Sequence, residues 1–243
     1  MTPGKSILDV SRLTKRFGGL IAVDDVSFKV RAYDVMGIIG PNGSGKSTMM
    51  NLISGALKPT SGKITIAGRD MTRLPAHQIA RFGVARTFQL VRVLPNLSVV
   101  ENVIAGAAFA HKQRWGPEAE AYAHDLLDRL ALGAKKNIPV GALTYIDQKR
   151  LELARALASE PNVLLLDEWL AGLNPSELQI GIELISSLRD EGRTVILVEH
   201  VMDAIRSLCD HCVAMNSGRI IAEGTPAEVL ADQEVIRAYL GSD

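Results

Sequence analysis

Short apolar runs separated by amphipathic stretches mark out the second half of this 243-residue chain. Val163 to Leu166 and Thr194 to Val198 are such runs, and Val35 to Ile39 is a third, nearer the N-terminus. Runs of this length are typical of parallel strands that are buried on both faces. Ser176 to Asp190 has helical spacing and follows Pro175, a residue favoured at the first position of a helix. The pattern predicts βαβ units in a parallel α/β sheet.

Two segments near the N-terminus have a different period. Ile7 to Leu13 and Val23 to Val30 alternate apolar and polar residues, and Gly18-Gly19 separates them. Alternation of this kind is typical of half-buried strands, so an antiparallel pair is predicted. Lys63 to Ala67 predicts a further short strand after a turn at residues 59–62.

A region of helical spacing is inserted between the strands. Thr87, Phe88 and Gln89 are predicted to close a strand, and from Val99 to about Ala158 the apolar residues recur at intervals of three and four. The sequence therefore predicts a helical insert within the α/β fold.

Composition and charge exclude several classes. Lys and Arg together number 27, as do Asp and Glu, so the chain lacks the basic excess of a nucleic-acid-binding protein. We therefore expect no nucleic-acid partner. No apolar run approaches the roughly 18 residues of a spanning helix, and Met1 to Ser11 lacks the apolar core of a signal peptide. We expect a cytoplasmic protein.

The two cysteines, Cys209 and Cys212, have C-x-x-C spacing. A zinc site of this type needs a second pair of ligands, and the sequence has no further cysteine. We predict two buried, reduced thiols at the end of a helix and the start of a strand.

The apolar run ending at Ile39 leads directly into a G-x-x-x-x-G-K-[ST] motif, with a helix expected to start near Lys46. Backbone N–H groups of such a glycine-rich loop converge on a phosphate, and the helix N-terminus adds its dipole. Lys46 would neutralise phosphate oxygens, and the Ser47 hydroxyl would bind Mg²⁺, so the ligand is expected to be a nucleoside triphosphate with Mg²⁺. The loop consists of Gly40, Pro41, Asn42, Gly43, Ser44, Gly45, Lys46, Ser47 and Thr48.

Polar residues follow the other predicted parallel strands. Asp167 and Glu168 end one run, and His200 follows Glu199 at the end of another. Because open α/β sheets bind ligands at the carboxyl ends of their strands, these residues should lie near the phosphate loop. Asp167 would hold Mg²⁺, Glu168 would act as general base on water, and His200 would reach the γ-phosphate. Gln89 has an amide suited to water or Mg²⁺.

These residues occur in the order found in the ATP-binding subunits of ABC transporters, which the chain resembles over nearly its whole length. The matching motifs are Phe17, the phosphate loop, Gln89, Asp167-Glu168, Ala171-Gly172-Leu173-Asn174 and His200. The resemblance implies one ABC ATPase domain, in which a P-loop core carries an antiparallel β-subdomain and a helical subdomain. Residues 1–88 and 160–220 would form the core, 89–159 the helical subdomain and 221–243 a C-terminal tail.

Several segments look more specifically like the ATPases of branched-chain amino-acid importers. They are Arg16-Phe17-Gly18-Gly19-Leu20, Arg86-Thr87-Phe88-Gln89, Ala171-Gly172-Leu173-Asn174-Pro175, Val198-Glu199-His200, Ile221-Ala222-Glu223-Gly224-Thr225-Pro226 and Tyr239-Leu240-Gly241. The resemblance implies an importer motor for these or related amino acids, on the inner face of the membrane. Its partners would be a second ATPase subunit, identical or different, two membrane-spanning permease subunits and, indirectly, a solute-binding protein.

The resemblance also assigns roles to individual residues. Phe17 would stack on the adenine, and Val23 would be a further ATP contact. Thr144 and Ile146, in the signature loop, would contact the nucleotide of the opposite subunit. Catalysis would fall to Glu168, His200 and Gln89, and metal binding to Ser47, Gln89 and Asp167.

Two positions depart from the family pattern. The signature loop reads Leu143-Thr144-Tyr145-Ile146-Asp147, with Ile146 where the family has its second glycine. We expect the β-branched side chain to hinder the approach of the backbone to a phosphate and to resist positive φ. Trp169 replaces the proline that usually follows the catalytic glutamate, and is interpreted as a packing change or as a disturbance of Glu168.

Two alternatives to the importer motor remain open. A regulatory subunit that binds ATP but hardly hydrolyses it would be consistent with Ile146. An ABC ATPase acting on DNA or ribosomes would generally carry paired domains or long coiled-coil inserts, and the sequence contains neither.

Overall fold

The centre of the protein is a six-stranded, mostly parallel sheet. The computed structural model describes residues 4–110 and 112–240; Gly241, the end of the tail motif, lies outside them. The strands are arranged in the order β10-β9-β3-β8-β7-β6, and only β10 runs antiparallel to its neighbour. Their bounds are β3 Val35–Ile39, β6 Val84–Arg86, β7 Val163–Asp167, β8 Thr194–Val198, β9 His211–Asn216 and β10 Arg219–Gly224.

Alternate residues of the central strands enter two different cores. Leu164 and Leu166 of β7 belong to the core that includes α6 and α7, whereas Val163 and Leu165 pack on the opposite face with the antiparallel sheet. All five residues of β3, β7 and β8 are buried. This burial on both faces explains the continuous apolar runs in the sequence.

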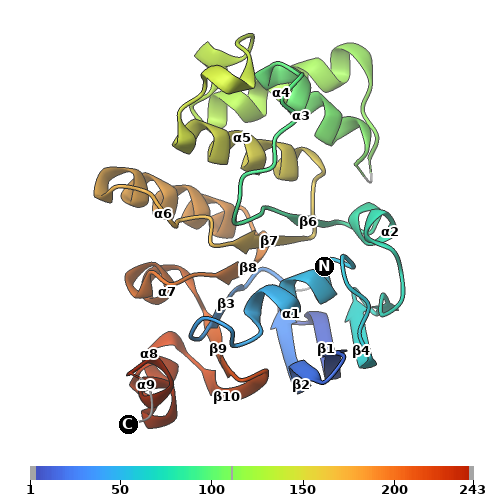
Figure 1. Ribbon diagram of the computed structural model, residues 1–243. Helices are drawn as coiled ribbons and strands as arrows, with labels where there is room; N and C mark the ends of the chain where they lie inside the picture. The colour runs from blue at the N-terminus through green and yellow to red at the C-terminus, as the bar shows by residue number, and fades with distance from the viewer. Residues whose placement is uncertain (1–3, 111, 241–243) are drawn as a thin grey trace.

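A second sheet, of order β2-β1-β4-β5, covers one face of the first, with α1 between them (Figure 1). Its long hairpin pairs Val10 with Phe28, in the alternating segments that predicted an antiparallel pair. The strands are β1 Ser6–Phe17, β2 Leu20–Arg31, β4 Ser61–Ile66 and β5 Arg69–Asp70.

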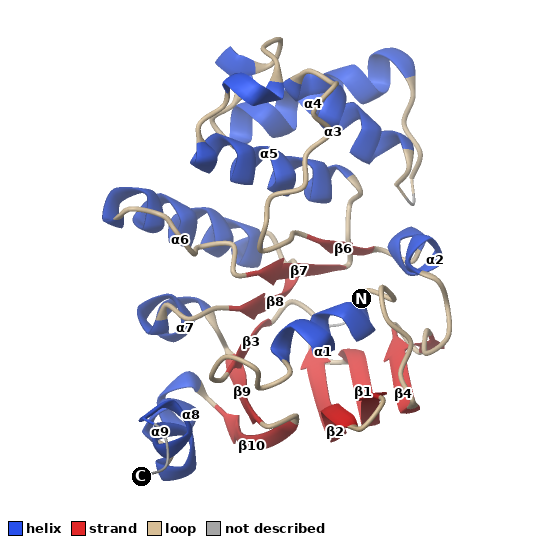
Figure 2. Cartoon of the chain, in the orientation of Figure 1, coloured by secondary structure: helices blue, strands red, loops and turns tan. Residues whose placement is uncertain are grey.

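Apart from α1 and α2, the helices form two groups (Figure 2). Helices α6 to α9 lie along the other face of the central sheet, and α3, α4 and α5 pack on one another as the predicted helical insert. The helices are α1 Lys46–Ile53, α2 Ala76–Arg81, α3 Val99–Ala108, α4 Gly116–Arg129, α5 Tyr145–Ala158, α6 Pro175–Asp190, α7 Met202–Leu208, α8 Pro226–Ala231 and α9 Gln233–Leu240. Two short 3₁₀ turns, Gly133–Lys135 and Val140–Ala142, precede α5.

Two local predictions have different outcomes. Strand β6 ends at Arg86, so the prediction that Thr87, Phe88 and Gln89 close it is wrong. Thr87 still donates its N–H to Leu165 of β7, and the chain then leaves the sheet toward the helical insert. Cys209 and Cys212 are buried and free, Cys209 directly after α7 and Cys212 near the start of β9, as predicted.

Candidate functional site

The phosphate loop connects the end of β3 to α1. Gly40 and Gly45 both have positive φ, and a Cβ on either would meet backbone oxygen, that of Met215 at 2.1 Å or Ala22 at 2.5 Å. These two glycines are therefore required by the packing of the loop against β9 and β2, whether or not a ligand is present. The sequence analysis explained these glycines by phosphate binding alone and did not anticipate the packing requirement.

Lys46 is buried at the centre of the loop. Its ammonium donates hydrogen bonds to the carbonyls of Gly40 at 2.7 Å and Pro41 at 3.0 Å. Burial lowers the pKa of Lys46, and the carboxylates of Glu168 and Asp167 oppose that effect. A phosphate would replace two neutral carbonyl acceptors with anionic oxygens, which form stronger bonds with an ammonium.

An open pocket of about 600 Å³ lies over this loop. It brings together residues far apart in the sequence, from the hairpin formed by β1 and β2 and from the segments that follow β3, β6, β7 and β9. Phe17 is 45% exposed at its rim. The remaining lining is Leu20, Ile21, Ala22, Asn42, Gly43, Ser44, Gly45, Lys46, Ser47, Thr48, Gln89, Glu168 and Ser217.

Three predicted catalytic residues meet at one edge of the pocket. Gln89 Nε2 donates to Glu168 Oε2 at 2.6 Å, and His200 Nε2 lies 2.9 Å from Glu168 Oε1. Glu168 N–H also bonds Val198 O, which ties the turn after β7 to the end of β8. The geometry therefore places a carboxylate, an amide and an imidazole within reach of one small ligand.

Asp167 has an environment that the sequence did not indicate. Its Oδ2 accepts from Arg86 Nη2 at 2.6 Å, in an ion pair almost closed to solvent. Arg86 also donates to Asn51 Oδ1 at 2.7 Å and Ser54 Oγ at 3.1 Å, both at the end of α1. Asp167 Oδ1 is buried with no hydrogen-bond partner in the described part of the chain. That oxygen is an available acceptor for a water or a hydrated cation.

The signature loop lies at the N-terminus of α5, outside the pocket. Thr144 caps the helix by accepting from Asp147 N–H, and its hydroxyl donates to Asp147 Oδ2 at 2.7 Å. Ile146 lies in the first helical turn, and its side chain is largely buried. Ile146 is not among the residues with positive φ, which agrees with the expectation that its β-branched side chain resists that conformation. The expected hindrance to the approach of the backbone to a phosphate stays a prediction.

Val23 does not line the pocket, in contrast to its predicted role as an ATP contact. Its side chain is fully buried in the core beneath the antiparallel sheet. The preceding residues Ile21 and Ala22 do line the pocket.

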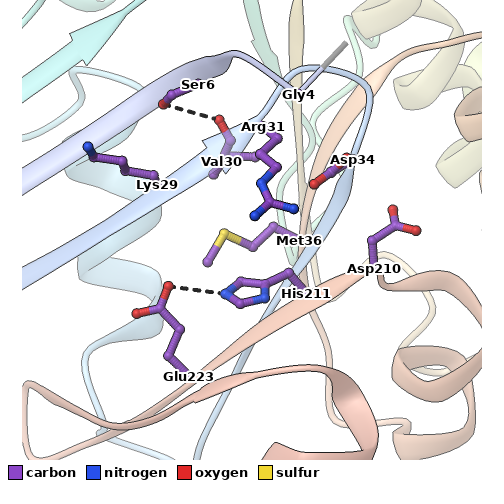
Figure 3. A pocket seen from close by; sticks show the side chains of 10 residues that line it. All are labelled: Gly4, Ser6, Lys29, Val30, Arg31, Asp34, Met36, Asp210, His211 and Glu223. Carbon is purple, nitrogen blue, oxygen red and sulfur yellow. Dashed lines mark hydrogen bonds and ion pairs between the residues drawn. The ribbon is translucent and has the colours of Figure 1, made fainter.

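A second pocket, of about 470 Å³, lies at the opposite end of the strands (Figure 3). Arg31, Asp34 and His211 line it near the amino ends of β3 and β9, and His211 pairs with Glu223 at 3.1 Å. Its lining contains both acidic and basic side chains, so it favours neither an anion nor a cation. The phosphate loop and the catalytic trio are absent from it.

Two features of the described residues concern metals and membranes. Within residues 4–110 and 112–240, no cluster of three or more His, Cys, Asp or Glu side chains could hold a metal ion. No helix in the same ranges combines the length and the apolar character needed to cross a membrane.

Comparison with known proteins gives consistent matches. A family model described as ABC transporter matches residues 23–171, and one described as branched-chain amino acid ATP-binding cassette transporter matches residues 219–243. The high-affinity branched-chain amino acid transport ATP-binding protein BraF of Pseudomonas aeruginosa is 42% identical, over 98% of each chain.

Two solved structures have similar folds. A nucleotide-free ATP-binding cassette from an ABC transporter has a TM-score of 0.89 and 32% identity, covering 98% of this chain and 100% of that one. A dimeric ATP-binding cassette in a post-hydrolysis state, bound to ADP and phosphate, has a TM-score of 0.82 and 27% identity, covering 90% and 98%.

Proposed function

This chain belongs to the ABC transporter family, and we propose that it is the ATP-hydrolysing subunit of an importer for branched-chain or related amino acids. It is an ATPase by family and fold. The observation that carries the site assignment is the contact of Glu168 with both Gln89 and His200 beside the phosphate loop. The proposed solute class rests on the relatives' names and on the family match of the C-terminal segment.

Each residue of the site has a distinct proposed task. Lys46 leaves the carbonyls of Gly40 and Pro41 to neutralise phosphate oxygens, and Phe17 stacks on the base. Glu168 accepts a proton from the attacking water. Both of its carboxylate oxygens are occupied by Gln89 and His200. We therefore expect one of these side chains to turn toward the bound nucleotide before hydrolysis.

The residues present fit a magnesium ion bound together with phosphate. The Ser47 hydroxyl and the Gln89 amide line the pocket, and the unpaired Asp167 Oδ1 can bind a metal-bound water. Mg²⁺ is usually held by few protein ligands together with phosphates and waters, which agrees with the lack of an all-protein cluster among the described residues. Such an ion would neutralise charge on the phosphates during their transfer.

We propose that two ATPase subunits close around the nucleotides, on the cytoplasmic face of two membrane-spanning subunits. The dimeric relative bound to ADP and phosphate supports the pairing of two ATPase subunits. In the proposed complex, the N-terminus of α5 would face the ATP bound to the partner subunit, and the segment from Gln89 to Asn102 would face the membrane subunits. Leu90 is 81% exposed in that segment, as a docking surface for another protein would require.

A regulatory subunit with little turnover is the second candidate, because Ile146 replaces a glycine in the signature loop. Ile146 adopts an ordinary helical conformation with its side chain largely buried, so this candidate depends on whether that side chain keeps the backbone of α5 from the partner's phosphate. Steady-state phosphate release by the purified protein distinguishes the two.

Lys46→Ala tests the assignment of the nucleotide site. It should weaken Mg-ATP binding by calorimetry, with Lys136→Met as a control that leaves binding unchanged. Equal affinity in Lys46→Ala and wild type would contradict the assignment.

Co-purification tests the transport role. When membranes are solubilised in detergent, the chain should purify together with membrane-spanning subunits. Vesicles reconstituted with that complex should take up leucine. Association with nucleic acid or ribosomes instead would contradict it.

A further inference from the structure

A buried ammonium joins the signature helix to the turn that carries Glu168. Lys149 of α5 is 1% exposed, and its Nζ donates to Trp169 O at 2.8 Å and Glu168 O at 3.3 Å. In return, the indole Nε1 of Trp169 donates to Lys149 O at 3.1 Å. Lys149 and Trp169 therefore exchange hydrogen bonds across the boundary between α5 and the end of β7.

The turn held in this way is a strained one. Glu168 has φ +49°, a left-handed conformation that a non-glycine residue keeps only when its surroundings impose it. On the far side of the turn, Leu170 N–H donates to Glu199 Oε1 at 2.7 Å. Lys149 and Glu199 thus engage the carbonyl and the N–H of the Trp169–Leu170 peptide, and Lys149 also reaches the carbonyl of Glu168.

The surroundings of Lys149 explain how a lysine is retained in the interior. Burial lowers the pKa of Lys149, while the carboxylates of Glu199, Glu152 and Glu168 favour its charged form. Its ammonium also lies 5.1 Å from the centre of the Tyr145 ring. A buried cation with fixed acceptors is held in one orientation, unlike a lysine on the surface.

We propose that Lys149 is a positioning residue for Glu168, and that the indole of Trp169 completes a clamp between the catalytic turn and helix α5. This inference rests on the proposed function, because it requires Glu168 to act on water. In the proposed dimer the N-terminus of α5 faces the partner's nucleotide. The clamp therefore connects the signature loop serving one ATP to the base serving the other. Trp169 takes the place of a residue, proline, that has no side-chain donor for this bond.

Kinetics of conservative variants test the clamp. Lys149→Met removes the donor but keeps the length of the side chain, and it should lower kcat about tenfold or more, because a misplaced base loses much of its effect. Mg-ATP affinity should stay unchanged, since Lys46 and the phosphate loop are intact. Lys149→Arg keeps donors and should retain most of kcat. Trp169→Phe keeps the bulk and loses Nε1, so its kcat should fall by a smaller factor.

Lys136→Met and Trp115→Phe serve as matched controls at positions away from the site, and both should leave kcat unchanged. A purely structural role of Lys149 would be shown by weaker ATP binding in Lys149→Met in proportion to its loss of turnover, and would overturn the proposal. Should Lys149→Met fail to fold, Trp169→Phe carries the same comparison of kcat with affinity.

The double variant with Glu168→Gln decides whether Lys149 acts through Glu168. In that background, Lys149→Met should cause no further loss of single-turnover hydrolysis, because the base is already gone. An equal loss in both backgrounds would show that Lys149 acts independently, and would overturn the proposal. If instead Glu168→Gln itself hydrolyses ATP at the wild-type rate, it is the assignment of Glu168 in the proposed function that fails.

Discussion

The hydroxyl oxygen of Tyr239 accepts a hydrogen bond from the backbone N–H of Gly40, at 2.7 Å. Tyr239 belongs to α9, the last helix of the chain, whereas Gly40 begins the phosphate loop. The carbonyl of the same glycine accepts from Lys46, so both polar groups of Gly40 are engaged. Burial raises the pKa of Tyr239, and the Gly40 N–H acts in the opposite direction. The C-terminal segment therefore contributes directly to the conformation of the phosphate loop.

Tyr239→Phe should loosen this end of the loop. The change leaves the buried Gly40 N–H without its acceptor, at a cost of about 1–3 kcal/mol in the free energy of unfolding. Amide hydrogen exchange at Gly40 should accelerate, and denaturant unfolding should give the loss of stability. Tyr122→Phe, on α4 and away from the loop, is the control. Unchanged exchange at Gly40 in Tyr239→Phe would show that the hydroxyl does not hold the loop.

Glu199 should make stability depend on pH. Burial raises its pKa to about 7, although the Leu170 N–H and the Lys149 ammonium favour the charged form. An unfolded glutamate titrates near about 4.3, so the folded state binds the proton more tightly between these values. The contribution of Glu199 to stability therefore falls as pH rises from about 4.3 to 7, by on the order of 3 kcal/mol, and is constant above that.

Glu199→Gln isolates this dependence, because glutamine can accept from Leu170 N–H but does not titrate. Relative to wild type, the variant should gain stability as pH rises from 5 to about 7. Denaturant unfolding of both proteins across that range measures the difference. A difference that stays constant with pH would contradict the raised pKa of Glu199.

Arg86→Met should destabilise the fold through Asp167. The two side chains form an ion pair almost closed to solvent, and removing one partner leaves a buried, uncompensated charge. Removing one partner of a buried ion pair typically lowers the free energy of unfolding by about 3–5 kcal/mol. The double variant Arg86→Met with Asp167→Asn should recover part of that stability in denaturant unfolding. A double variant less stable than Arg86→Met alone would show that the charge of Asp167 is not the cause.

Phe17→Ala should weaken the binding of ATP and GTP to a similar degree. The ring is exposed at the rim of the pocket, beneath the Lys15 ammonium at 4.9 Å. Stacking on a base contributes on the order of 1 kcal/mol and does not depend on the hydrogen-bonding edge of the base. Calorimetric titration with both nucleotides measures the two losses. A loss confined to ATP would indicate that hydrogen bonds, not Phe17, hold the base.

Local patterns predicted most of the fold because apolar runs and alternation report burial directly. The runs that became β3, β7 and β8 were predicted to within one residue, and so was the start of α6 at Pro175. Gln89, Glu168 and His200 could be grouped because each follows a strand whose end lies at one edge of the sheet.

The site contacts that the sequence analysis did not predict involve residues whose neighbours in the sequence give no sign of these contacts. Arg86 reaches Asp167 only through the pairing of β6 with β7, and Lys149 reaches Trp169 only through the packing of α5 on the end of β7. Arg86 and Lys149 are both basic residues with long side chains, and residues of this type usually lie on the protein surface, so their sequence positions did not indicate burial. Trp169 was interpreted as a packing change or a disturbance of Glu168, but its indole nitrogen forms a specific hydrogen bond.

Steady-state phosphate release from Glu168→Gln tests whether this chain hydrolyses ATP with Glu168 as the base. Glutamine keeps the shape and can still contact Gln89 and His200, but it cannot take a proton from water. We predict wild-type affinity for Mg-ATP together with a loss of turnover of about 100-fold or more. Turnover close to the wild-type rate, with ATP binding intact, would contradict it.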